Sequence, residues 1–100
     1  STIAVRSPRD GLAFAEVADC TADHVDSLVS AARACLNSTW SHASSVDARC
    51  SVLRQISTGL RAQLDELAAL ETRDCGKPIS ESRVDIETCA ALCDFYADAG

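Results

Sequence analysis

The sequence predicts a mainly α-helical segment in which an N-terminal β-hairpin is followed by three or four amphipathic helices. Apolar residues recur every three or four positions between residues 46 and 70, which is the spacing of one face of an α-helix. Ahead of them, the β-branched stretch Thr2–Arg6 precedes a turn signal that contains a Pro and a Gly. We therefore expect the hairpin over residues 1–19 and the helices over residues 20–100, within one small domain.

The expected hairpin turns at Ser7–Gly11, where Pro8 and Gly11 are residue types found in tight turns. Leu12–Ala18 would form the returning strand. Because a two-stranded hairpin alone is marginally stable in water, this one should lie on the helices or join a larger sheet.

The first helix is expected to start after a cap at Asp19 or Thr21. Its apolar stripe consists of Val25, Leu28, Val29, Ala32, Cys35 and Leu36. The next residues, Asn37–Ser44, are rich in Asn, Ser and Thr, which predicts a loop. Trp40 within this loop is expected to close a gap over the core.

A central helical run is expected to start at Ser44 and Asp47, which have the spacing of a capping box. Its apolar stripe is Val46, Cys50, Leu53, Ile56, Leu60, Leu64, Leu67 and Leu70. Gly59 costs about 1 kcal/mol relative to Ala in a helix interior. A break between Gly59 and Gln63 would divide the run into two helices, and the apolar spacing leaves this open.

The end of the central run is firmly specified. Gly76 can adopt the left-handed conformation on which helices commonly stop, and Pro78 cannot prolong a helix. Ser80 and Ser82 are the expected caps of a last helix. Its stripe is Ile86, Cys89, Ala90, Cys93 and Ala97, but Ala91, Leu92 and Phe95 are apolar on its other faces. Such a helix must be covered on several sides, so we expect the natural chain to continue beyond Gly100.

Charge and hydropathy exclude several classes of partner. The net charge is −6 and the nine basic residues are scattered, which argues against nucleic acid or an anionic membrane surface. No apolar run approaches the roughly 18 residues of a membrane span. The first residues also lack the pattern of a secretion signal, so we expect a cytoplasmic protein, with a peroxisomal one as the alternative.

The six cysteines are interpreted as reduced thiols packed in the core. A disulfide framework is disfavoured because nothing indicates export. A zinc site built from Cys89, Cys93 and either His24 or His42 is disfavoured because the sequence contains no Cys-x-x-Cys pair.

Residues that could perform chemistry are few. The four glycines are single and far apart, so neither a phosphate loop nor a dinucleotide fingerprint is present. His24 and His42 are interpreted as solvated surface residues. Lys77 could meet an anion, but it is more simply explained as a positive charge at a helix C-terminus. The residues alone predict no catalytic and no cofactor-binding side chain.

Several strings, in order and with matching spacing, give the chain a family resemblance. They are Pro8–Gly11, Val25–Arg33, Trp40, Arg49, Leu53-Arg54, Leu67–Pro78, Asp85-Ile86 and Phe95–Ala97. Together they resemble the N-terminal segment of aldehyde dehydrogenases. The string Leu-Glu-Thr-Arg-Asp-Cys-Gly-Lys-Pro at positions 70–78 is the specific part. The strings Asp-Cys-Gly-Lys-Pro at 74–78 and Phe-Tyr-Ala-Asp at 95–98 are most similar to betaine-aldehyde and aminoaldehyde dehydrogenases.

The resemblance implies that the intact enzyme has a Rossmann-like α/β fold and oxidises an aldehyde to a carboxylic acid with NAD or NADP. Residues 1–100 would be the N-terminal part of its coenzyme-binding domain, with the catalytic domain absent. The family's nucleophilic Cys, its general-base Glu and its nucleotide loop would all lie beyond Gly100, so this segment alone should be inactive. The implied partners are the rest of the chain and further copies of it, in a dimer or a tetramer.

The resemblance also implies a site for K⁺ or Na⁺. Many family members hold a monovalent cation with two backbone carbonyls and one carboxylate, which here fall at Val5, Arg6 and Asp85. The alternative is that Asp85 only serves the first turn of a helix. Ser7 and Leu12 depart from the Asn and Glu that are usual in the family, which puts the geometry of the hairpin in question.

An alternative function remains open. The chain could be a stand-alone helical interaction module that shares ancestry with these enzymes and has lost catalysis. The sequence decides neither the aldehyde, nor NAD against NADP, nor the oligomeric state.

Overall fold

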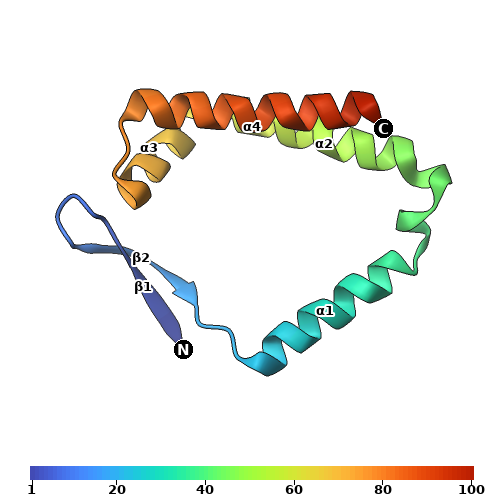
Figure 1. Ribbon diagram of the computed structural model, residues 1–100, viewed down its shortest axis with the longest axis horizontal. Coiled ribbons are helices and arrows are strands. Elements are labelled where there is room, and N and C mark those ends of the chain that lie inside the picture. The colour runs from blue at the N-terminus through green and yellow to red at the C-terminus, as the bar shows by residue number, and fades with distance from the viewer.

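The chain forms an open ring of helices and strands in a computed structural model that describes residues 1–100 (Figure 1). The elements in order are β1 (Thr2–Arg6), β2 (Ala13–Ala18), α1 (Ala22–Leu36), η1 (Thr39–Ser41), η2 (Ala43–Ser45), α2 (Val46–Ala62), α3 (Leu64–Cys75) and α4 (Ile79–Ala99). The predicted hairpin and helices are confirmed, and the central run is divided into two helices.

The hairpin pairs β1 with β2 in antiparallel register, from Thr2 opposite Ala18 to Arg6 opposite Ala13. The register shifts between Val5 and Arg6. At the turn, Gly11 has a φ of 72°, in the left-handed region that favours glycine. Its neighbour Asp10 accepts a hydrogen bond from the backbone N–H of Leu12 at 2.9 Å, which closes the turn.

Helix α1 starts where the sequence predicts, with Thr21 as its cap. The Thr21 hydroxyl accepts from the N–H of His24 at 3.4 Å, and His24 Nδ1 accepts from the N–H of Thr21 at 3.2 Å. His24 is exposed, as expected, and also forms half of this reciprocal cap. No residue of α1 is buried, and Leu28 and Leu36 are 65% and 67% exposed.

The predicted loop after α1 contains two short 3₁₀ helices, η1 and η2. Trp40 lies in η1 and is 42% exposed, so the expectation that it closes a gap over the core is wrong for this segment. Arg49 of α2 instead donates to the backbone carbonyl of His42 at 3.1 Å, which holds the loop against α2.

The expected capping box at the start of α2 is also wrong. Ser45 precedes the helix, but neither its side chain nor that of Ser44 caps the helix N-terminus. Ser45 ends the 3₁₀ helix η2 with φ −102° and ψ 8°, not in the extended conformation that a capping residue usually adopts. Its hydroxyl instead donates to the backbone carbonyl of Thr39 at 2.5 Å.

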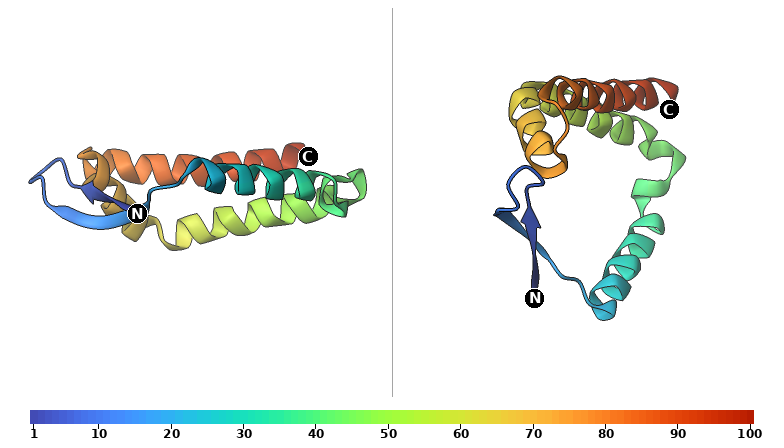
Figure 2. Two further views of the ribbon diagram at one scale, coloured as in Figure 1. Left: turned by 90° about the horizontal axis from the view of Figure 1, so that it is seen from below. Right: turned by 60° about the vertical axis from the view of Figure 1, so that its left-hand side comes forward.

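The break that the sequence left open falls at Gln63, between α2 and α3. The N–H of Gln63 still bonds to the carbonyl of Gly59 at 3.1 Å, so α2 ends with a complete last turn. After the break, α2 and α3 both pack against α4, and α2 runs beside α4 in all views (Figures 1 and 2).

Helix α4 begins at Ile79, earlier than the predicted caps Ser80 and Ser82. Pro78 holds the position before the helix, and its carbonyl accepts from the N–H groups of Glu81 at 3.0 Å and Ser82 at 3.1 Å. The Ser82 side chain is buried and shares a 2.8 Å hydrogen bond with the Thr72 hydroxyl of α3. Ser82 therefore joins two helices and does not cap α4.

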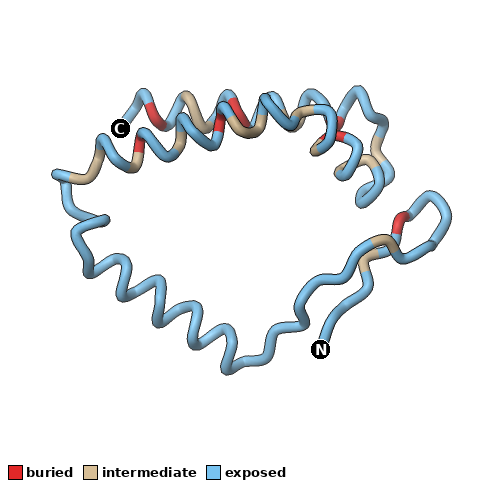
Figure 3. Tube along the Cα trace, turned by 180° about the vertical axis from the view of Figure 1, so that it is seen from behind, coloured by how far each residue is buried: buried red, intermediate tan, exposed pale blue.

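Small residues make the core. The buried residues outside the hairpin are Cys50, Ser57, Ala68, Ser82, Ala90 and Ala97, all in α2, α3 and α4 (Figure 3). Cys50 is a buried thiol as predicted, but Cys20, Cys35, Cys75 and Cys89 are exposed, so the interpretation of all six as core thiols is wrong for this segment.

The overall shape is thin and open. The radius of gyration is 17.3 Å and the extents are 50 × 35 × 15 Å, whereas a compact domain of this length has a radius of about 13 Å. Much of the apolar surface therefore stays uncovered. None of the helices combines the length and the hydropathy that crossing a membrane requires.

Candidate functional site

Three charged side chains meet where α3 turns into α4, and we name Glu71, Lys77 and Asp85 the carboxylate junction. Lys77 Nζ donates to Glu71 Oε1 at 2.9 Å and also pairs with the carboxylate of Asp85. These hydrogen bonds, first to Asp85 and then to Glu71, raise the pKa of Lys77 above its ordinary value. Lys77 therefore does more than complement the end of α3, because it joins one carboxylate from each helix.

The backbone between the helices brings Lys77 to this position. Gly76 ends α3 with a φ of 76°, as the sequence predicts. A Cβ at Gly76 would lie only 2.9 Å from Cγ of Pro8, so the hairpin turn rests directly on the end of α3. The glycine is thus required twice, for its backbone conformation and for this close approach.

The hairpin contributes a groove beside the junction. This groove has a volume of about 510 Å³, and Val5, Phe14, Leu67, Leu70 and Ile86 supply most of its apolar lining. Glu71 also lines it. The guanidinium of Arg73 covers the ring of Phe14 at 4.4 Å, which fixes the hairpin against α3.

The structure brings some of the predicted cation ligands close to the junction. Val5 and Glu71 line the same groove, and Asp85 is joined to Glu71 through Lys77. The register shift between Val5 and Arg6 falls where the expected carbonyl ligands lie, and such bulges interrupt the hydrogen-bond ladder locally. The Arg6 side chain is engaged elsewhere, donating to the Gly11 carbonyl at 3.1 Å.

Glu71 is the residue of the junction that sequence reasoning missed. Its Oε2 atom is buried and has no hydrogen-bond partner. Two carboxylates and one ammonium leave one uncompensated negative charge, and carboxylate oxygens are the ligands that hard cations prefer. The donor set therefore fits a single monovalent cation. The only signal in the sequence was the position of Glu71 inside the family-specific string, since the turn that folds Lys77 back on it is a tertiary feature.

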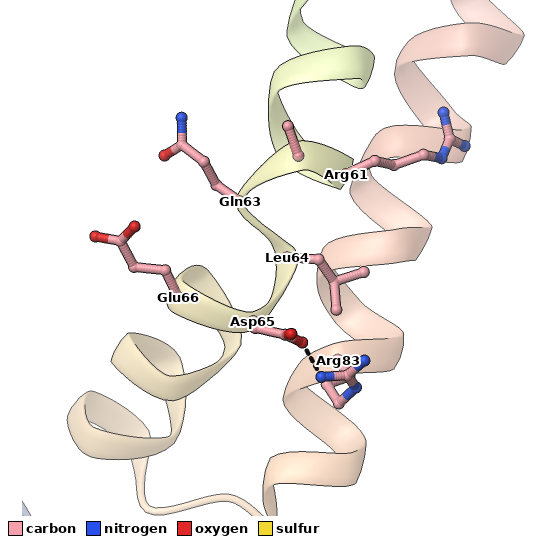
Figure 4. Close-up of a pocket in the computed structure, with 7 residues that line it drawn as sticks. Arg61, Gln63, Leu64, Asp65, Glu66 and Arg83 are labelled. Atoms are coloured by element: carbon pink, nitrogen blue, oxygen red, sulfur yellow. Dashed lines mark hydrogen bonds and ion pairs between the residues drawn. The ribbon is translucent and has the colours of Figure 1, made fainter.

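A separate pocket, lined mostly by polar residues, lies at the break between α2 and α3 (Figure 4). Arg83 of α4 pairs there with Asp65 of α3 (Figure 4). Arg61 also borders this pocket but binds α4, with Nε at 2.9 Å from Glu87 and Nη1 at 2.7 Å from Asp94. These contacts raise the pKa of Arg61, and hydrogen bonds from Arg61 and then Ser57 lower the pKa of Asp94. These ion pairs join α2 and α3 to α4.

No group of three or more His, Cys, Asp or Glu side chains converges as a metal cluster anywhere in the chain. The junction has only two carboxylates, so any cation held there would need further oxygen ligands, such as backbone carbonyls.

Comparison with known proteins gives a consistent result. The family model described as "Aldehyde dehydrogenase family" matches residues 1–100. Succinate semialdehyde dehydrogenase [NAD(P)+] Sad of Escherichia coli (strain K12) is 44% identical over 55 residues, which are 55% of this chain and 12% of that protein.

Two solved structures share the fold at high similarity. Gamma-glutamyl-gamma-aminobutyraldehyde dehydrogenase of Burkholderia cenocepacia J2315 superposes with a TM-score of 0.91 at 38% identity, over 98% of this chain and 20% of that one. PnpE in complex with nicotinamide adenine dinucleotide superposes with a TM-score of 0.89 at 32% identity, also over 98% and 20%. The chain thus spans about a fifth of the length of these solved relatives.

Proposed function

This chain belongs to the aldehyde dehydrogenase family, and we propose that it is the N-terminal portion of an enzyme that oxidises an aldehyde to the carboxylic acid. The family match over residues 1–100 is the observation that supports this most directly. NAD or NADP would accept the hydride in that reaction. A relative whose name includes NAD(P)+ and a solved relative in complex with nicotinamide adenine dinucleotide support this cofactor.

We propose that residues 1–100 form the N-terminal part of the coenzyme-binding domain and that the catalytic residues lie in the rest of the protein. The open shape supports this, because α1 buries none of its residues and the radius of gyration exceeds that of a compact domain. A stand-alone interaction module would leave the same apolar faces in water whenever no partner is bound. The expected partners are therefore the remainder of the enzyme and further copies of it, in a dimer or a tetramer.

The proposed substrate is an aldehyde with a nitrogen-containing group, such as betaine aldehyde or an aminoaldehyde. The strings at residues 74–78 and 95–98 support it, as does the name of the Burkholderia relative, gamma-glutamyl-gamma-aminobutyraldehyde dehydrogenase. Succinate semialdehyde is the competing substrate, because the Escherichia coli relative carries that name.

We propose that the cation ligands are the backbone carbonyls of Val5 and Arg6 and the carboxylate of Asp85, with K⁺ or Na⁺ as the ion. The uncompensated charge of the carboxylate junction and the unpartnered oxygen of Glu71 support this site.

The function is tested with the full-length protein, NAD⁺ or NADP⁺, and a panel of betaine aldehyde, an aminoaldehyde, succinate semialdehyde and a simple alkyl aldehyde. We expect reduced nicotinamide to form only when an aldehyde is present, with the highest kcat/KM for the nitrogen-containing aldehydes. A preference for succinate semialdehyde would overturn the substrate class. No reduction with any aldehyde would overturn the proposed reaction.

A further inference from the structure

Lys77 places a positive charge on the carboxylates that the proposed cation needs. Its ammonium group donates to Glu71 Oε1 at 2.9 Å and pairs with Asp85 in the same arrangement. A lysine ammonium is a compact, strongly hydrated point charge, much like an alkali ion in its demand for oxygen ligands. The two positive charges would therefore seek the same carboxylate oxygens and repel each other at short range.

The chain holds Lys77 close to these carboxylates. Lys77 lies in the short connection between α3 and α4, between the left-handed Gly76 and the conformationally fixed Pro78. Pro8 of the hairpin lies against Gly76 and limits movement of this connection. A tethered group of this kind has a high effective concentration at its binding partner.

Glu71 carries the part of the negative charge that Lys77 does not reach. Lys77 donates to Oε1, whereas Oε2 is buried without any partner. A buried carboxylate oxygen that lacks a partner is unfavourable, so this atom is the part of the junction most in need of a further positive ligand.

We infer that Lys77 is a built-in competitor of the alkali cation at this junction, and that Glu71 binds the cation through Oε2. This inference rests on the proposed cation site and adds to it the two residues that set its affinity. Lys77 weakens cation binding and Glu71 strengthens it. Substitutions of these two residues should therefore change the affinity in opposite directions, which a merely structural role in joining α3 to α4 does not predict.

The test measures the melting temperature of the full-length protein while KCl replaces choline chloride at constant ionic strength. A ligand that binds only the folded state raises the melting temperature with its concentration, so the midpoint reports cation affinity without an activity assay. We expect Lys77→Gln to lower the KCl midpoint at least about fivefold and Glu71→Gln to raise it by a similar factor, as is typical of coupled sites.

Two further variants serve as controls. Glu66→Gln removes the same charge from the same helix at an exposed position outside the junction, and it should leave the KCl midpoint unchanged. Lys77→Arg retains the positive charge, so its KCl midpoint should stay close to that of the unsubstituted protein. If Lys77→Gln does not fold, the direction of the Glu71→Gln shift still decides the role of Glu71.

An unchanged or higher KCl midpoint in Lys77→Gln would overturn the inference, as would an unchanged midpoint in Glu71→Gln. If the melting temperature does not change with KCl concentration in any variant, both the inference and the cation site are overturned. A dependence on KCl that emerges only in Lys77→Gln would support it. The aldehyde assay separates these outcomes from the proposed reaction, because an active enzyme without any response to KCl contradicts only the cation site.

Discussion

Helix α1 and the pair formed by α2 and α4 are the two long sides of the ring, and they differ in what they bury. Both sides carry amphipathic helices. Helices α2 and α4 bury Cys50, Ser57, Ala90 and Ala97 against each other, while α1 buries nothing (Figure 3). An apolar stripe thus predicts that a face seeks cover, but the partner that covers it is a property of the tertiary structure.

The contact between α2 and α4 buries small residues and leaves large ones exposed. Ala90 and Ala97 lie inside, whereas Leu92, Phe95 and Tyr96 of the same helix are half exposed or more. Small side chains allow two helix axes to approach, and bulky ones are left on the outer faces. These outer faces are a second uncovered surface, comparable to that of α1.

The largest expected effect comes from α1. If the rest of the enzyme covers its apolar face, Leu28→Ala in the full-length protein should lower the free energy of unfolding by about 2–5 kcal/mol. Ser30→Ala on the opposite face of α1 should stay within about 0.5 kcal/mol. Denaturant melts of both variants measure this, and a Leu28→Ala variant as stable as the control would mean that α1 remains in water.

A smaller loss is expected on the packed side. Ala90 of α4 is fully buried where this helix packs against its neighbours. Ala90→Leu should overpack this contact and lower the free energy of unfolding by about 1–3 kcal/mol. Its exposed neighbour provides the control, since Ala91→Leu adds the same atoms where this segment leaves space. Equal losses in the two variants would show that α4 is as crowded on its outer face as on its inner one.

The smallest effect should come from the ion pairs that join α2 to α4. Hydrogen bonds from Arg61 and Ser57 lower the pKa of Asp94 in the folded state. Its contribution is therefore complete above the ordinary Asp range and is lost as the pH falls through the lowered pKa. Asp94→Asn should flatten the acid limb of a stability–pH profile by a small amount, because the pair is exposed and screened by salt. An unaltered acid limb would show that Asp94 contributes nothing measurable.

Local signals predicted much of the fold. Thr21, Gly76 and Pro78 act as the sequence indicates, and the break at Gln63 falls inside the range that Gly59 suggested. The predictions that failed include the serine caps and the burial of Trp40 and of most cysteines. Ser82 shares its hydrogen bond with Thr72 of another helix, and no local pattern records such a contact.

The candidate site was less accessible to sequence reasoning. The family resemblance indicated Asp85, but the role of Glu71 depends on how Lys77 folds back across the turn between α3 and α4. The contact between Pro8 and Gly76 joins residues far apart in the chain, and only the folded backbone brings them together.

The sequence by itself determined the order of the elements, the residues at which most of them end and the family, because caps, turn residues and apolar periodicity act over a few positions. Only the tertiary structure decided which stripe is buried, which serine caps and which carboxylates share Lys77. These outcomes depend on distances between residues that are remote in sequence, and such distances are set when the helices pack.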